Sequence, residues 1–199
     1  YYSIVMVFLE IPSGYVGDVV GRRQSLLIGA SLTFFGFCIY SFSYTMPGFM
    51  LAATMLAIGG SFISGSDSAL LYDTLSVLKK ENDYVQLEGR NYAISNFSEA
   101  SAGILGGILA IYSLRWPFFV QATVASLGIW AAYSLVEPQR FKLSRKENLE
   151  NIKEVLRHAI IGNAHLRWLI LFSAFMGCAT LVIAWFAQAI DVRTRLWMG

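Results

Sequence analysis

The sequence predicts an all-α, polytopic helical membrane protein, and three observations favour this class. Hydrophobic residues make up 56% of the 199 residues and charged residues only 14%, whereas a soluble domain carries about a quarter charged residues. The mean hydropathy is +0.54. The charges also lie between long uncharged runs, which would cross the roughly 30 Å of a bilayer core as helices rising about 1.5 Å per residue. A helical core in water is disfavoured, because its apolar runs are usually only about 10 to 14 residues long.

Six runs are predicted to span the bilayer, at residues 1–16, 24–44, 48–72, 92–114, 116–136 and 168–190. The first run is short, carries Glu10 and lacks the basic start of a cleaved signal sequence. We therefore expect this span to be cut at its start and the chain to be a piece of a longer protein. Asp67 is the one charge in the third run and Glu99 the one charge in the fourth, and the other three runs carry none.

The basic residues are distributed unevenly among the connections between these runs. Twelve of the 15 Lys and Arg lie in the first, third and fifth connections, and the other three, Arg115, Arg193 and Arg195, lie on the opposite side. Lys and Arg accumulate on the cytoplasmic side of membrane proteins, so the chain is predicted to begin outside. The net charge of +2 is too small to indicate a nucleic-acid partner. The expected surroundings are the lipid bilayer.

The long fifth connection has an organisation of its own. Between residues 149 and 160, apolar residues recur at helical spacing with charged residues between them, which predicts an amphipathic helix along the cytoplasmic surface. This connection separates five tightly joined spans from a sixth. We therefore expect residues 1–136 to form five spans of one bundle, residues 137–166 to be a cytoplasmic linker, and residues 167–199 to hold the first span of a second bundle.

Motifs for catalysis or metal binding were sought in the same sequence. Cys38 and Cys178 lie inside predicted spans without metal-ligand spacing, and neither His158 nor His165 has acidic or cysteine neighbours that would suggest a site. The sequence contains no phosphate-binding loop, nucleophile elbow or zinc motif. No enzyme activity, cofactor or metal is therefore predicted, and an intramembrane enzyme is the least favoured function class.

The first connection reads GYVGDVVGRRQ, and its short, glycine-rich form indicates two antiparallel neighbouring helices. Gly14, Gly17 and Gly21 are expected to permit a tight turn and a close approach of the helices. The segment resembles the cytoplasmic loop motif of the major facilitator superfamily, in which a glycine, an aspartate, a second glycine and two basic residues stand at fixed spacing. The matching residues are Gly14, Asp18, Gly21, Arg22 and Arg23, while Val19 stands where a basic residue is usual.

Two further segments are similar to a bacterial exporter-like branch of this family: EIPSG at 10–14 and SGSDSALLYD at 64–73. The segment LRWPF at 114–118 is similar to the family's turn between its fifth and sixth spans. By this alignment the chain runs from the second to the seventh span of a twelve-span transporter. The resemblance implies that a small-molecule substrate passes between two six-span bundles by alternating access. It also implies an integral protein of the bacterial inner membrane. A non-transporting receptor or scaffold is the alternative.

The resemblance further implies that Asp18 and the two arginines form a network that latches the bundles in one state. Asp67 and Asp73 are candidate partners for Arg22 or Arg23. The alternative is that the arginines serve only as a topology signal.

Two carboxylates are predicted to lie within the membrane. Counted along a helix, Glu10 and Glu99 each lie roughly 12 Å inside the apolar layer, where an ionisable group is costly and is a functional candidate by default. We expect them to serve substrate binding or proton coupling, with a structural carboxyl between helices as the alternative. Gln188 in the sixth run is a further candidate for substrate contact, with packing as its alternative.

Small residues surround Glu99 at helical spacing. Gly103, Gly106 and Gly107 are predicted to let a neighbouring helix approach closely. In the exporter branch this span carries an antiporter motif, but Gly103 replaces its proline, and residues 51–71 lack the arginine common in the fourth span of proton-coupled drug exporters. These departures weigh against drug–proton antiport, and they leave the predicted transporter class unaffected.

Overall fold

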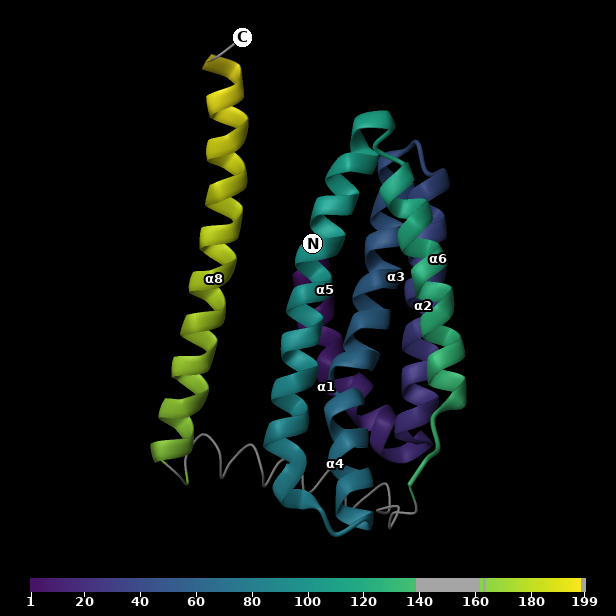
Figure 1. Cartoon of the computed structure of the whole chain (residues 1–199), viewed down its shortest axis with the longest axis vertical. Coiled ribbons are helices and arrows are strands. Elements are labelled where there is room, and N and C mark those ends of the chain that lie inside the picture. The colour runs from purple at the N-terminus through teal and green to yellow at the C-terminus, as the bar shows by residue number, and fades with distance from the viewer. Residues whose placement is uncertain (139–161, 163, 198–199) are drawn as a thin grey trace. The chain divides into compact units, whose positions relative to one another are not determined.

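The computed structural model describes residues 1–138, 162 and 164–197 (Figure 1). Every element assigned in these residues is helical, which confirms the predicted all-α class. The chain divides into two compact units, Tyr1–Ser144 and Arg145–Gly199, and each is described by itself. The bounds predicted for the bundles and the linker stay a prediction.

The first unit contains α1 (Tyr2–Val20), α2 (Arg22–Phe42), α3 (Met46–Ser64), α4 (Asp67–Val77), the short 3-10 helix η1 (Glu81–Asp83), α5 (Tyr84–Tyr112) and α6 (Trp116–Ser134). Prolines stand in the first turns of α3 and α6, where their missing N–H group would have no helical partner. Pro12 lies inside α1, where it removes a helical hydrogen bond. The two parts of α1, Tyr2–Glu10 and Pro12–Val20, are accordingly bent by 46°.

Three stretches of the described residues are long and apolar enough to cross a membrane, judged by length and composition. They are Arg22–Phe42, Met46–Val77 and Glu81–Tyr112, and α1 is a fourth if its two bent parts form one span. The sequence predicted six spans. The predicted fifth run is helical as α6, but polar residues such as Gln121 and Thr123 lower its hydropathy. The predicted third run is interrupted at Gly65 and Ser66, between α3 and α4.

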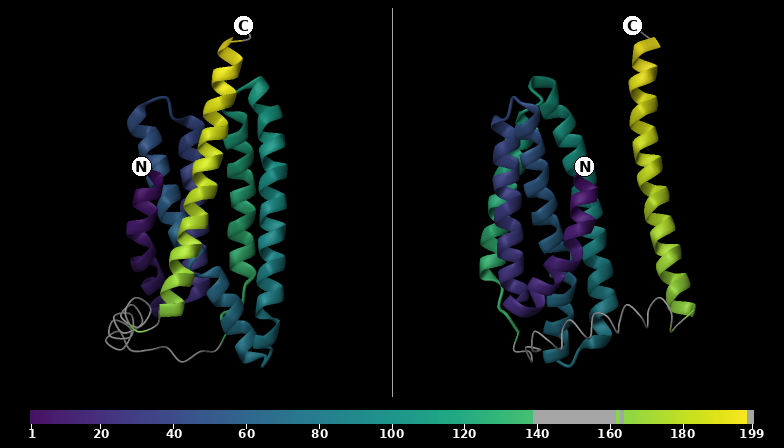
Figure 2. Two further views of the ribbon diagram at one scale, coloured as in Figure 1. Left: turned by 90° about the vertical axis from the view of Figure 1, so that its left-hand side faces the viewer. Right: turned by 180° about the vertical axis from the view of Figure 1, so that it is seen from behind.

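The centre of the first unit is α2, which packs against α3 on one side and α6 on another, while α1 packs mainly against α3 (Figure 2). The α2–α3 contact is close because both helices present glycines. A Cβ added to Gly29 would lie 2.9 Å from the carbonyl oxygen of Gly59, and one added to Gly59 would lie 2.8 Å from that of Gly29. Such close backbone approach is how helices associate in lipid, where burial of apolar area gives little driving force.

Buried serines add polar contacts between the same helices. The Ser13 hydroxyl on α1 donates to the carbonyl oxygen of Ser61 on α3 at 2.8 Å, and the Ser25 hydroxyl on α2 donates to that of Phe62 at 3.3 Å. An interhelical hydrogen bond of this kind is worth about 0.6 to 2 kcal/mol in a membrane. These bonds help to fix how α1 and α2 lie against α3.

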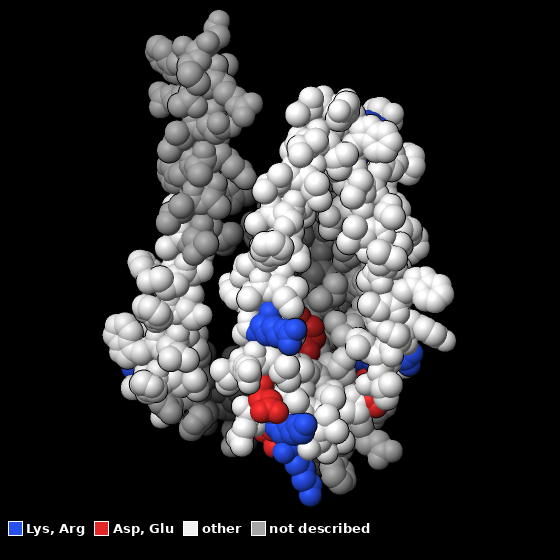
Figure 3. Space-filling model, in the orientation of Figure 1, with Lys and Arg blue, Asp and Glu red and all other residues white. Residues whose placement is uncertain are grey.

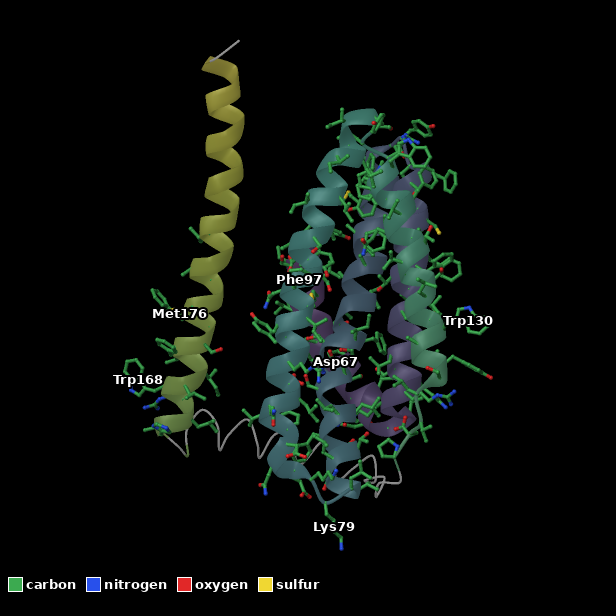
Figure 4. The ribbon with its side chains drawn as sticks, viewed as in Figure 1. Asp67, Lys79, Phe97, Trp130, Trp168 and Met176 are labelled. Carbon is green, nitrogen blue, oxygen red and sulfur yellow. The ribbon has the colours of Figure 1, made fainter. Side chains whose placement is uncertain are left out.

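The outer surface of the first unit is apolar over most of its length. Trp130 is 77% exposed and points away from α6 (Figure 4), as expected of a side chain in contact with lipid. On the face shown in Figure 3, most of the Lys, Arg, Asp and Glu side chains of the first unit lie in its lower half, over α4, the start of α5 and the lower end of α6. Lys79 projects from the loop that follows α4 (Figure 4). The inside and outside assignment of the two ends stays a prediction.

The second unit contains α8 (Ala164–Trp197), which includes the predicted sixth run. Most of its described apolar side chains, among them Trp168 and Phe172, are exposed. Gln188 falls on this helix in a stretch whose side chains lie outside the described residues. The amphipathic helix predicted between residues 149 and 160 also lies outside the described residues.

Candidate functional site

The turn between α1 and α2 consists of a single residue, Gly21, because α1 ends at Val20 and α2 begins at Arg22. Gly21 has φ 132° and ψ 146°, a conformation that L side chains rarely adopt. A Cβ at this position would also lie 3.3 Å from a carboxylate oxygen of Glu137. Both the backbone conformation and the surrounding space therefore require glycine here.

Arg22, the first residue of α2, contacts residues of α1 and α4 and the turn between α3 and α4. Its Nη2 atom lies 2.7 Å from Oδ1 of Asp18 on α1, and its Nε atom lies 3.6 Å from Oδ2 of Asp73 on α4. Its Nη1 atom donates to the carbonyl oxygen of Gly65 at 3.3 Å. The guanidinium side chain is only 16% exposed, against 35% for Asp18 and 25% for Asp73. We call Asp18, Arg22 and Asp73 the arginine cluster.

The arginine cluster is partly shielded from water, which strengthens its ion pairs. Two unit charges about 4 Å apart attract by about 4 kcal/mol at an effective dielectric constant near 20, before the cost of desolvation is subtracted. Desolvation removes much of this gain, so the cluster is well suited to opening and closing. The Asp73 distance is that of an ion pair and not of a hydrogen bond, and Nε of Arg22 has no hydrogen-bond partner within the described residues.

Arg23 points to different partners. Its Nη2 atom donates to the carbonyl oxygen of Tyr133 on α6 at 2.6 Å, and its guanidinium lies over the Tyr133 ring, 5.3 Å from the centroid. The backbone N–H groups of Arg22 and Arg23 donate to the two carboxylate oxygens of Glu137 at 2.9 and 2.7 Å. A carboxylate at this place satisfies two of the amides that a helix start leaves unpaired and complements the helix dipole.

Glu137 was not among the residues predicted from sequence. It lies 115 positions from Arg22, and no local spacing relates the two. The available signal was weaker: a lone acidic residue directly follows the uncharged run at 116–136, at the end of the span that packs on α2.

Other predicted members of the site are placed elsewhere. Asp67 lies at the start of α4 (Figure 4), where its carboxylate accepts the N–H of Ser68 at 2.7 Å. Of the two candidate aspartates, it is Asp73 that lies against Arg22. Within the described residues a Cβ at Gly14 would meet nothing within 4 Å, so the close approach expected at Gly14 stays a prediction. Gly17 does lie in a close contact, since its Cβ would be 3.1 Å from Oγ of Ser66.

The two membrane carboxylates lie in different surroundings, and both are exposed in the described unit. Glu10 is on α1 directly before the bend, and its carbonyl oxygen accepts the Ser13 hydroxyl at 3.0 Å. Glu99 lines an open groove of about 570 Å³ between α5 and α6, together with Ser98, Gln121 and other residues. Figure 1 shows these two helices diverging away from the loop that joins them.

The predicted packing glycines on α5 lie near the same groove, and Gly106 lines it. Within the described residues, a Cβ at Gly103, Gly106 or Gly107 would meet nothing within 4 Å. Their packing role stays a prediction.

A family profile described as Major Facilitator Superfamily matches residues 1–193. The chain belongs to this family. The predicted resemblance is thereby confirmed, and the helices of the first unit are part of a major-facilitator-type bundle in an integral membrane protein.

Three relatives illustrate the range of proteins to which the chain is similar. An "Uncharacterized transporter" of Buchnera aphidicola subsp. Schizaphis graminum is 26% identical over 77% of this chain and 37% of its own length. "Probable vesicular acetylcholine transporter-A" of Danio rerio is 25% identical over 74% of the chain and 28% of its own length. "Methyl viologen resistance protein SmvA" of Salmonella typhimurium is 29% identical over 66% of the chain and 27% of its own length. No solved structure matches the chain.

The family and the names of these relatives indicate a transporter and not an enzyme. The chain spans well under half the length of each of these relatives, so the activity of a whole transporter is a proposal for it.

Proposed function

We propose that the protein containing this chain is a secondary transporter that exports a small solute across the bacterial inner membrane by alternating access. The arginine cluster of Asp18, Arg22 and Asp73 is the observation that carries the proposal. Ion pairs that join the ends of α1, α2 and α4 suit a contact that is made in one state of the cycle and released in the other.

The energy scale of the arginine cluster suits such a latch. A partly exposed ion pair contributes about 1 kcal/mol or less, which corresponds to a severalfold change in the ratio of two states. A stronger contact would hold one state so firmly that the cycle would stall, and a weaker one would not bias it. We propose that the cluster tunes the population of one state, and that Arg23 anchors the neighbouring α6 while Arg22 makes and breaks its pairs.

We propose Glu10 as the first candidate for proton coupling and Glu99 as the second. Glu10 lies directly before the bend that Pro12 introduces into α1. A bend with a missing helical hydrogen bond is a place where a helix changes shape at low cost. A carboxyl group at this place could take up a proton on one side of the membrane and release it as the helix moves. Gln188 on α8 stays a candidate for substrate contact.

For the substrate we propose an organic cation. The names of two relatives refer to methyl viologen and to acetylcholine, both of which are positively charged organic molecules. The six runs predicted to span the bilayer carry the acidic Glu10, Asp67 and Glu99 and neither lysine nor arginine. Acidic groups in an apolar cavity favour a cation by simple charge attraction.

The latch is tested with Asp18→Asn in the full-length protein, assayed for export in proteoliposomes. The variant should lower the transport rate severalfold while expression stays near normal, because the amide cannot pair with the guanidinium of Arg22 as an ion. The matched control is Asp83→Asn, which removes an exposed acidic residue of η1 and should leave transport unchanged. A wild-type transport rate in Asp18→Asn would contradict the latch and would indicate that the loop motif serves only as a topology signal.

A further inference from the structure

Both ends of α2 are bonded to residues that flank α6. At the start of α2, Glu137 accepts the backbone N–H groups of Arg22 and Arg23 at 2.9 and 2.7 Å. At the other end, Arg115, the N-cap residue of α6, donates from its guanidinium to the carbonyl oxygens of Ser41 and Ser43 at 3.2 and 3.1 Å. A negative group therefore meets the positive end of the α2 dipole, and a positive group meets its negative end.

The two ends differ in one respect that matters for function. The Arg115 guanidinium lies over the Tyr44 ring, 3.6 Å from its centroid, and it donates to Ser41 and Ser43 at the end of α2 that is far from the arginine cluster. Glu137, in contrast, holds the backbone of Arg22 itself. Each end of α2 is thus hydrogen-bonded to a residue that flanks α6. One of these contacts lies beside the arginine cluster, and the other lies at the opposite end of α2.

The hydrogen bonds to Glu137 hold the backbone of Arg22 and so fix the direction in which its side chain extends. The carboxylate uses one oxygen for each of two successive amides, and it lies 3.3 to 3.4 Å from the place a Cβ of Gly21 would take. Gly21, Arg22 and Arg23 are therefore held as a unit, and the guanidinium of Arg22 extends from this unit to Asp18 and Asp73. Without the carboxylate, two helix-start amides would lose their partner and the first turn of α2 would be free to fray.

We propose that Glu137 is a positioning residue of the arginine cluster, which sets the latch by holding the start of α2 against the end of α6. This inference rests on the proposed function of the cluster. Glu137 accepts the backbone N–H groups of Arg22 and Arg23, so its proposed effect on the cluster passes through Arg22.

The test uses the full-length protein with Cys38, Cys178 and every cysteine outside this chain replaced by serine, and with a reporter thiol introduced by Ser66→Cys. Ser66 is 1% exposed and lies against Gly17 of α1, so a thiol there reacts with a maleimide only when α1 and α4 separate. Removing a carboxylate from a helix start typically changes the equilibrium constant between two conformations of that region by about two- to fivefold. Glu137→Gln should raise the labelling rate by about that factor and lower the maximal transport rate with KM unchanged.

The matched control is Arg115→Gln, which removes the α2–α6 bond at the opposite end. It should leave the labelling rate at the level of the reporter protein. Equal labelling in Arg115→Gln and Glu137→Gln would show that Glu137 only supports packing, and would overturn the inference. In a background of Arg22→Ala, Glu137→Gln should change transport no further, because the residue through which it acts is gone. An undiminished effect in that background would also overturn it.

The substitution Glu137→Asp tests whether the length of the side chain matters in addition to its charge. Glu137→Asp keeps the carboxylate but cannot span both amides, so its labelling rate should lie between those of the parent and Glu137→Gln. It also serves as the test if Glu137→Gln does not fold. Wild-type labelling and transport in both Glu137 variants, with impaired Asp18→Asn, would refute the role of Glu137 and leave the latch standing. Wild-type transport in Asp18→Asn would refute the latch itself.

Discussion

The two long helices α2 and α5 differ in how they contact their neighbours. Helix α2 is in close contact with α3 through Gly29 and Gly59, and both its ends are bonded to residues flanking α6. Helix α5 is longer, at 29 residues, but residues 89–100 are all exposed in the described unit. It contacts α4 and α6 over limited stretches.

Within the described residues, α2 and α5 differ in the interactions that hold a membrane helix in place. Both helices are apolar enough to cross a bilayer, so hydropathy does not distinguish them. They differ in close backbone approach and in satisfied helix ends, which are the interactions that stabilise helix pairs in lipid. The contrast predicts that equivalent substitutions will have large effects on α2 and small ones on α5.

The largest effect is expected from Gly29→Leu. Its Cβ would lie 2.9 Å from the backbone oxygen of Gly59 and 2.7 Å from the Ile63 side chain, and backbone cannot yield as a flexible side chain does. Overpacking of this kind typically costs about 1 to 3 kcal/mol or more, enough to lower the yield of folded protein. Thermal unfolding in detergent measures the loss.

Gly103→Leu on α5 is the matched variant, because a Cβ there meets nothing within 4 Å in the described residues. It should unfold within a few degrees of the parent. Equal destabilisation by the two substitutions would mean that α5 is packed as closely as α2 in the full-length protein.

A smaller effect is expected from Gly21→Ala at the turn before α2. The backbone conformation with φ 132° is strained for alanine by about 1 to 3 kcal/mol, and the added methyl group would press on the Glu137 carboxylate. Stability and transport should both fall. Gly14→Ala, in the open part of α1, should be neutral or stabilising by up to about 1 kcal/mol, because alanine is the better helix former. A stable, active Gly21→Ala would contradict the strained turn.

The smallest effect on stability is expected from Glu10→Gln and Glu99→Gln. Both side chains are exposed in the described unit, so each substitution should change the free energy of unfolding by less than about 0.5 kcal/mol. Their transport should differ. If Glu10 carries the proton, Glu10→Gln should retain substrate counterflow in proteoliposomes and lose pH-driven accumulation, while Glu99→Gln retains both. Loss of pH-driven accumulation in Glu99→Gln but not in Glu10→Gln would indicate that Glu99 on α5 carries the proton. Unchanged pH-driven transport in both variants would show that neither carboxylate does.

The sequence was informative where the physical signal is local. The long apolar runs predicted helices at the places where α2, α5 and α6 are found, since each run has the length that a bilayer requires. The spacing of Gly14, Asp18, Gly21, Arg22 and Arg23 predicted the family and the turn. It did not distinguish between the glycines, although Gly21 is required by its conformation and Gly14 has open space around it.

What the sequence by itself determined is the class of this protein, because hydropathy, run length and motif spacing are properties of neighbouring residues. The tertiary structure alone decided which charges distant in the sequence meet. Asp73 and not Asp67 lies against Arg22, since the turn of α4 that carries Asp73 packs against the start of α2. Glu137 binds the start of α2 from 115 positions away, because α2 and α6 pack side by side. A contact between residues so distant depends on the geometry of helix packing, which no local pattern of residue types records.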